Sequence, residues 1–337
     1  MPARPRLPSV SVHGDRVGVL QVTAPATVLE KRLDQLTDLA TLAGYALTAT
    51  SRHTDLLHRA ARSRRMTLAA ELQWQLLPVR GCLAPEYELA GHLEPAYAVY
   101  ADNFDWSEGH LLVSITDAAN HARSTPLLTT LSVTAARNAR RGCLGIAEQA
   151  AMADQAVYTH QGDHSVDAIF MTIDIATGRA SALKAGSPAV VLLREGALHP
   201  IGLTDQIPLG MFEGTEYTEQ SFQLATGDRL LLMSDGFTDG WSPRGGSLPH
   251  QRLLEILERD VDEHPAGVVR SLIDELIAHH GGNDLDDDAT VVCLDWNGPG
   301  CPNELTLTEP DIVVREARPH LHAVAPAQGL RITAGVR

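Results

Sequence analysis

The sequence predicts an α+β fold with antiparallel sheets, because its strand patterns come in hairpins rather than alternating with helices. One pair of strands, 168–174 and 179–183, flanks the turn sequence Ile-Ala-Thr-Gly. A second pair, 190–193 and 197–201, flanks Arg-Glu-Gly. Several other apolar runs of strand length lead directly into or out of aspartate residues.

The remaining patterns place further elements along the same domain. Strands are expected at 87–93, 111–116, 229–233 and 289–294. Helices are expected over about 125–158, 253–261 and 268–279. The sequence therefore predicts one α+β domain over residues 78–296, followed by a Pro-rich C-terminal tail, 297–337, with one strand-like piece at 304–314.

Two segments precede this domain. Residues 1–27 are expected to be poorly ordered apart from a strand at 16–23, and residues 28–77 form a helical linker that stops at Pro78. Within the linker, apolar residues recur at steps of four and three, as on one face of a helix: Leu29, Leu33, Leu36, Ala40, Ala43 and Leu47. This face packs either within its own domain or against a second copy of the chain. The strand and this helix together resemble the end of a GAF sensory domain, of which only a part is present.

Composition excludes some classes of function. The formal net charge of −15 disfavours nonspecific binding to nucleic acid or to an anionic membrane. No apolar run is long enough for a transmembrane helix, and the N-terminal residues lack the apolar core of a signal peptide. The four cysteines show no CxxC spacing, which favours reduced structural thiols. The expected location is the cytoplasm.

Aspartates at strand ends are the informative feature. Asp117 and Asp235 each follow an apolar strand, Asp287 precedes one, and Asp102 lies between the first two predicted strands of the domain. Neighbouring antiparallel strands bring such ends together, and clustered carboxylates repel each other unless cations neutralise them. Mg²⁺ and Mn²⁺ suit carboxylate and water ligands. An aspartate at a strand end can also serve a turn alone, and a calcium-binding or structural domain would rest only on the acidic run 284–288.

The order and flanks of these aspartates resemble the SpoIIE-like branch of the metal-dependent protein phosphatases, the PPM superfamily. The fullest match is Gly227-Asp-Arg-Leu-Leu-Leu-Met-Ser-Asp235-Gly236, where the family has Gly-Asp-x-Leu-Leu-Leu-x-Thr/Ser-Asp-Gly. Other family motifs resemble 71–78, 100–105, 117–122, 185–188, 208–211 and 287–291.

This resemblance implies a β-sandwich of two antiparallel sheets flanked by helices, with two Mn²⁺ or Mg²⁺ ions at one end. By position, the metal ligands would be Asp102, Asp117, the backbone carbonyl of Ala118, Asp235 and Asp287. Asp117 would bridge the ions, and Asp117 and Asp235 would act in catalysis through metal-bound water. Asp288 is the alternative to Asp287 if the register is shifted by one residue.

The implied activity is hydrolysis of phosphoserine or phosphothreonine on a regulatory protein, for example an anti-sigma-factor antagonist. The implied partner is that phosphoprotein. A homodimer through the N-terminal helices is the alternative to packing of their apolar face within the chain's own domain.

Several motif residues depart from the family pattern. Tyr100 and Ala101 replace two glycines before Asp102, and Ser187 replaces a histidine. The family's Gly-His-Gly reads Asn120-His121-Ala122. Since glycines near a metal site often permit unusual backbone angles, these changes favour an alternative function, a catalytically weak phosphatase-like scaffold that binds a regulatory partner. All the acidic positions are present.

Overall fold

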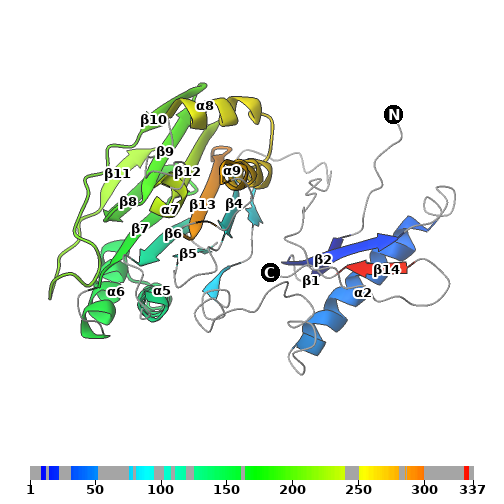
Figure 1. Cartoon of the computed structure of the whole chain (residues 1–337), viewed down its shortest axis with the longest axis horizontal. Coiled ribbons are helices and arrows are strands. Elements are labelled where there is room, and N and C mark those ends of the chain that lie inside the picture. Colours follow the sequence, from blue (N-terminus) through cyan, green and yellow to red (C-terminus); the bar gives the residue numbers. More distant parts are fainter. Residues whose placement is uncertain are drawn as a thin grey trace. The chain divides into compact units, whose positions relative to one another are not determined.

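A computed structural model gives the fold of the chain (Figure 1). It describes residues 9–12, 15–22, 32–51, 76–78, 81–94, 102–107, 111–118, 125–160, 164–239, 250–280, 285, 287–299 and 330–333. The chain divides into two compact units. The smaller contains Met1–Met66 and Val313–Arg337, and the larger contains Thr67–Ile312. Within the described residues, no helix is both long and apolar enough to cross a membrane.

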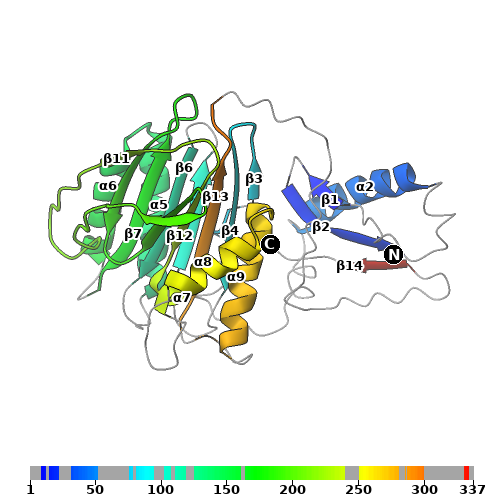
Figure 2. The same ribbon diagram turned by 90° about the horizontal axis from the view of Figure 1, so that it is seen from above.

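The larger unit contains two antiparallel sheets, as the hairpin patterns predict (Figure 2). The six-stranded sheet has the order β10-β9-β12-β13-β4-β3, and the five-stranded sheet has the order β11-β8-β7-β6-β5. Their strands are β3 (Gly81–Leu83), β4 (Tyr87–Glu94), β5 (Asp102–Ser107), β6 (Leu111–Ala118), β7 (Val166–Ile173), β8 (Arg179–Ala185), β9 (Ala189–Arg194), β10 (Ala197–Pro200), β11 (Gln220–Gln223), β12 (Asp228–Met233) and β13 (Ala289–Trp296).

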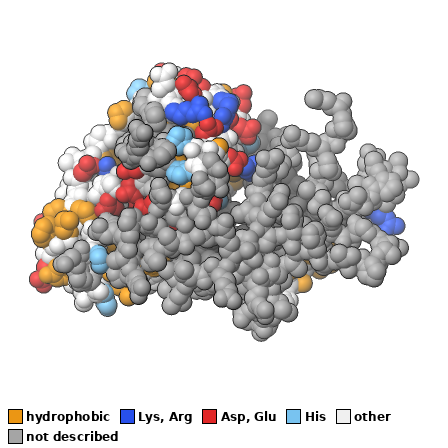
Figure 3. All heavy atoms as spheres, in the orientation of Figure 1, with side chains coloured by type: hydrophobic (Ala, Val, Ile, Leu, Met, Phe, Trp, Pro, Cys, Tyr) orange, Lys and Arg blue, Asp and Glu red, His pale blue; other side chains and the backbone are white. Residues whose placement is uncertain are grey.

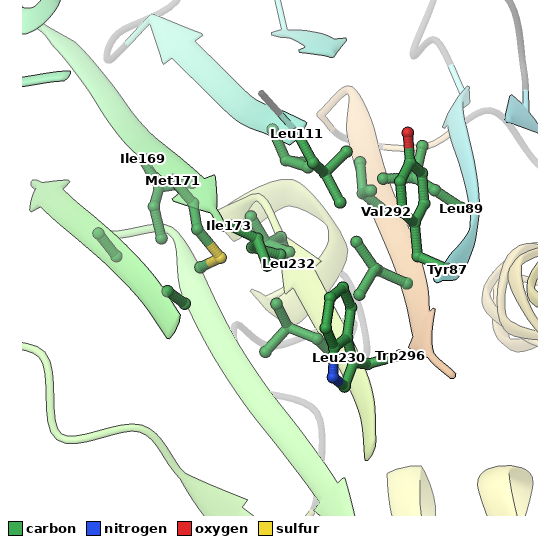
Figure 4. Close-up of a cluster of buried hydrophobic side chains, with 14 of the residues drawn as sticks. Tyr87, Leu89, Leu111, Ile169, Met171, Ile173, Leu230, Leu232, Val292 and Trp296 are labelled. Carbon is green, nitrogen blue, oxygen red and sulfur yellow. The ribbon is translucent and has the colours of Figure 1, made fainter. Parts of the chain in front are cut away.

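Alternating side chains of these strands build a four-layer structure. In β7, Ile169 and Met171 pack between the sheets, whereas Phe170 packs with the helices α5 (Thr125–Arg141) and α6 (Ile146–His160). In β12, Leu230 and Leu232 join the same core between the sheets (Figure 4). Leu231 and Met233 instead pack with residues of α8 (His250–Arg259) and α9 (Pro265–His279). The predicted β-sandwich flanked by helices is therefore confirmed.

Both predicted hairpins are present. Strand β7 pairs with β8, and β9 pairs with β10. In the second hairpin Glu195 and Gly196 have φ values of 50° and 75°, as expected for a two-residue turn whose twist matches its strands.

The helical pattern over 125–158 forms two helices rather than one. After α5, Cys143 adopts φ 60° and its N–H donates to the carbonyl of Arg140, while the N–H of Leu144 donates to the carbonyl of Ala139. This is the hydrogen-bond pattern of a Schellman helix end. The expectation of one long helix is wrong because Cys143 adopts the left-handed conformation, which ends α5 and reverses the chain. The glutamate of α6, Glu148, then accepts from the N–H of Gly145.

The smaller unit is a three-stranded sheet with one helix. The sheet has the order β1 (Ser9–Val12), β2 (Asp15–Val22), β14 (Leu330–Thr333), so a strand of the C-terminal segment pairs with an N-terminal strand. The helix α2 (Leu33–Ser51) packs on β1 and β2. Ala40 is buried, whereas Leu39, Leu42 and Tyr45 are exposed. The apolar face that contains Ala40 thus packs within its own unit.

Parts of the sequence-based expectation lie outside the described residues. These are the strand-like piece at 304–314 and most of the helical pattern at 66–77. The resemblance to a GAF domain remains a prediction. The strand predicted at 16–23 corresponds to β2.

Candidate functional site

Three aspartates occupy neighbouring positions at one end of the five-stranded sheet. In the register of β5 with β6, Asp102 is the partner of Asp117. In the register of β6 with β7, Asp117 is the partner of Asp167, and Ala118 is the partner of Val166. Asp117 and Asp167 are both buried, with 6% and 9% of their surface exposed. Two acidic side chains are therefore withdrawn from water at adjacent strand positions.

The six-stranded sheet presents Asp235 and Asp287 at the corresponding ends of β12 and β13. Ser234, directly after β12, donates its N–H to the carbonyl of Thr290 at 3.0 Å. Its hydroxyl accepts from the N–H of Thr290, also at 3.0 Å. Both residues are fully buried. These hydrogen bonds fix the end of β12 beside the start of β13, and so place Asp235 next to the segment that carries Asp287.

Gly236 allows the close approach of these two segments. A Cβ atom at this position would overlap the carbonyl oxygen of Asp288 and lie 3.2 Å from Cβ of Asp287. Oδ1 of Asp287 accepts a hydrogen bond from the N–H of Asp288 at 2.8 Å. Asp287 is partly exposed, whereas Asp288 is buried. Position 236 therefore has no room for a side chain, which explains why glycine follows Asp235 at this strand end.

The short connection from β8 to β9 joins the two groups of aspartates. Ser187 in this connection donates its N–H and its hydroxyl to Oδ2 of Asp167, at 2.8 and 2.6 Å. The same hydroxyl oxygen lies 3.5 Å from Oδ2 of Asp235. Since β8 belongs to the five-stranded sheet and β9 to the six-stranded sheet, Ser187 connects acids from both sheets.

The electrostatics of this end favour a cation. Burial raises the pKa of Asp167, the hydrogen bonds from Ser187 lower it, and the nearby charge of Asp235 raises it again. Oδ1 of Asp235 is buried and accepts no hydrogen bond from the described residues. Buried carboxylate oxygens of this kind are hard donors that suit Mg²⁺ or Mn²⁺.

The donors present therefore fit a divalent metal in chemical type. Among the described side chains, however, no three His, Cys, Asp or Glu residues converge closely enough to hold an ion as they stand. The side chain of Asp102 and residues 119–124, which include His121, lie outside the described part. The roles of Asp102, Asp117, Ala118, Asp235 and Asp287 as metal ligands remain predictions, and the choice between Asp287 and Asp288 remains open.

Sequence reasoning missed Asp167. In its strand, Ile169, Met171 and Ile173 follow at alternate positions and face the core between the sheets, so Asp167 occupies the same face. A charged residue on a buried face is costly without a partner, and such residues concentrate at functional sites. That break in the apolar alternation is the signal that could have identified it.

Comparison with known proteins gives one matching family and two relatives of about 30% identity. The family described as Stage II sporulation protein E (SpoIIE) matches residues 107–297. Protein IcfG of Synechocystis is 30% identical over 141 residues, which are 41% of this chain and 22% of that protein. Phosphoserine phosphatase RsbP of Bacillus subtilis is 30% identical over 122 residues, which are 36% of this chain and 29% of that protein. The matched region is thus less than a third of either relative.

A solved structure shows the same fold. The PP2C phosphatase domain with a regulatory fragment of SpoIIE from Bacillus subtilis superposes with a TM-score of 0.51 at 19% identity. The superposition covers 62% of this chain and 63% of that one. At this level of identity the similarity establishes the architecture of two sheets with flanking helices, and no more.

Proposed function

The chain belongs to the SpoIIE family, and on that premise we propose that it is a divalent-metal-dependent protein phosphatase specific for phosphoserine or phosphothreonine. The observation that carries the proposal is the meeting of acidic residues from both sheets around Ser187. Oδ1 of Asp235 is buried there without a hydrogen-bond donor among the described residues. Such an arrangement is stabilised by cations, and two cations are the usual means of hydrolysing a phosphate monoester without a covalent intermediate.

The proposed metal ligands are Asp102, Asp117, the carbonyl of Ala118, Asp235 and Asp287, with Asp117 shared between two Mn²⁺ or Mg²⁺ ions. When bound, the ions would supply an activated water and neutralise charge on the phosphoryl group. The protein contributes a rigid frame. Asp117 is held within a sheet by neighbours on both sides, and Asp235 is fixed by the hydrogen bonds of Ser234 with Thr290. Preorganised ligands of this kind lose little entropy on binding.

The substrate is proposed to be a phosphorylated regulatory protein, for example an anti-sigma-factor antagonist. Support comes from the name of the relative RsbP, a phosphoserine phosphatase. The net charge of −15 disfavours nucleic acid as a partner. On the face in Figure 3, acidic side chains are spread over the larger unit, while the blue basic ones gather near α8. We place this reaction in the cytoplasm.

A homodimer through the N-terminal helices is a further part of the proposal. The exposed residues Leu39, Leu42 and Tyr45 of α2 have 44%, 67% and 47% of their surface accessible. They lie on a face other than the one that packs on its own sheet. Light scattering on the wild type and on Leu42→Glu tests this part, since the charge should shift a dimer toward monomer. An unchanged mass in the two proteins would contradict it.

Hydrolysis of p-nitrophenyl phosphate tests the main proposal. The wild-type chain should hydrolyse it with Mn²⁺ and lose the activity with EDTA. Asp117→Asn and Asp235→Asn should each remove it, since both replace a proposed ligand by a neutral amide. A folded wild-type chain without metal-dependent turnover would exclude the enzyme.

One observation favours the second candidate, a phosphatase-like scaffold that binds a regulatory partner with little turnover. Where the family carries a histidine, this chain has Ser187, whose N–H and hydroxyl are both engaged by Asp167. Calorimetry separates the candidates. Binding of Mn²⁺ and of a phosphopeptide without hydrolysis would support the scaffold.

A further inference from the structure

The hydroxyl of Ser187 lies between two carboxylates but has only one proton to donate. Its oxygen is 2.6 Å from Oδ2 of Asp167 and 3.5 Å from Oδ2 of Asp235. The first distance is that of a strong hydrogen bond to a carboxylate, and the second is too long for an ordinary O–H···O bond. The proton is therefore directed to Asp167.

The backbone keeps Ser187 in this position. Its own N–H donates to the same oxygen of Asp167 at 2.8 Å. The preceding residue, Gly186, has φ +81°, and a Cβ atom there would overlap the carboxyl group of Asp167. The N–H of Gly186 also donates to the carbonyl of Gln206 at 2.9 Å. Two hydrogen bonds and a close backbone approach thus fix Ser187 against Asp167 rather than against Asp235.

This arrangement determines what is left for Asp235. A hydrogen bond donated to a carboxylate oxygen occupies one of the lone pairs that a cation would otherwise use. Because the hydroxyl proton of Ser187 is directed to Asp167, Oδ2 of Asp235 receives no close donor from this serine. Oδ1 of Asp235 is buried and accepts no hydrogen bond from the described residues. Both oxygens of Asp235 remain suited to a metal.

We propose that Asp167 is a positioning residue of the metal site. By accepting both the N–H and the hydroxyl of Ser187, it keeps the serine proton away from Asp235 and so preserves Asp235 as a metal ligand. This role rests on the proposed function, because it requires that Asp235 bind a divalent cation. Asp167 acts through Ser187, and neither residue needs to contact the metal.

The test is a calorimetric titration of the full chain with Mn²⁺ for wild type, Asp167→Asn, Ser187→Ala and the double variant. Asp167→Asn leaves a neutral amide oxygen, a weaker acceptor than a carboxylate, so the serine hydroxyl turns toward the charged Asp235. We expect Mn²⁺ affinity to fall about tenfold, as is typical when a residue that orients a ligand is changed. Ser187→Ala alone should bind Mn²⁺ nearly as well as wild type. In the Ser187→Ala background, Asp167→Asn should reduce Mn²⁺ affinity clearly less than it does in the wild type.

Asp205→Asn provides the control for charge. Asp205 is paired with Lys184 at 2.8 Å and precedes Gln206, which pairs with Ala185, and the hydrogen bonds of Ser187 in the described part go to Asp167 rather than to Asp205. Its substitution removes one negative charge near this end of the sheet and should leave Mn²⁺ affinity nearly unchanged. If Asp167→Asn does not fold, as judged by circular dichroism, Asp167→Ala removes the same acceptor and carries the same expectation.

Equal losses of affinity from Asp167→Asn in the two backgrounds would overturn the positioning role, since Asp167 would then act by its charge alone. An unchanged affinity in Asp167→Asn would overturn it as well. A wild-type chain that binds no Mn²⁺ would instead contradict the proposed function, so the two failures are distinguishable.

Discussion

Aspartates lie at both ends of strand β12, but only at the start of the strand do described arginines form ion pairs with the nearby aspartates. At the start of the strand, Asp228 is 1% exposed. It accepts hydrogen bonds from Nε and Nη2 of Arg194, at 2.8 and 2.6 Å. Beside it, Arg229 donates to both oxygens of Asp295 at 2.7 and 2.8 Å. Past the other end of the strand, no described Lys or Arg forms an ion pair with Asp235 or Asp167.

This difference separates structural from functional acids within one motif. Asp228 and Asp235 belong to the same segment, 227–236, and their residue type alone gives no distinction. Bidentate arginine pairs neutralise the acids at the start of the strand. At the other end no described arginine or lysine forms an ion pair with Asp235 or Asp167, and the pKa of Asp167 is raised mainly by burial, against a smaller opposite effect of the Lys184 charge. A cation from solution can complete this end only, which is why we place the metal there.

Removal of an acid at the metal end should have the largest effect on activity. Asp235→Asn should lower the rate of Mn²⁺-dependent p-nitrophenyl phosphate hydrolysis by about a hundredfold or more, because a proposed metal ligand becomes neutral. Its metal-free stability should stay near that of wild type, since no described ion pair is broken. An Asp235→Asn variant that retains most of its activity would contradict a role of Asp235 as a metal ligand.

Removal of an acid at the arginine end should instead affect stability. Asp228→Asn replaces the carboxylate that Arg194 and the N–H of Ala225 contact. Arg194 is partly exposed, so we expect unfolding in urea to become easier by about 2 kcal/mol, below the full cost of breaking a buried pair. Mn²⁺ affinity should not change. Unaltered stability, or weakened metal binding, would show that the two ends do not divide their roles in this way.

The smallest expected effect is a pH dependence at Asp167. Its pKa is raised above 3.8 in the folded state, so the folded protein holds this proton more tightly than the unfolded chain does. In the presence of a chelator, wild type should therefore gain stability relative to Asp167→Asn as the pH falls through the raised pKa toward 3.8. Urea unfolding of both proteins between about pH 7 and pH 4 measures this difference. A loss of wild-type stability relative to Asp167→Asn on acidification would contradict the burial of an unneutralised carboxyl group.

Sequence alone was sufficient where the determinants are local. The apolar run of β12 and the Ser-Asp-Gly after it predicted both the strand and the exact position of Asp235. The hairpins followed in the same way from turn residues between apolar runs. The positions of Asp117 and Asp287 at strand ends were also predictable, although their metal roles remain untested.

Sequence alone was insufficient where partners are distant along the chain. Asp167 becomes noticeable only because pairing places it beside Asp117 and Ser187. The break between α5 and α6 depends on Cys143 in a conformation that usually requires glycine. The strand β14 gains its hydrogen bonds from β2, more than 300 residues earlier, so its own four residues give little indication of it.

The aspartates at the shared end of the two sheets should require divalent cations to neutralise them. Titration of the metal-free full chain with Mn²⁺ in a calorimeter tests it directly, with Asp117→Asn as the matched variant. We predict binding of two ions to the wild type and loss of that binding in Asp117→Asn, because Asp117 is proposed to bridge them. Absence of binding to the folded wild type, or equal affinity in Asp117→Asn, would contradict it.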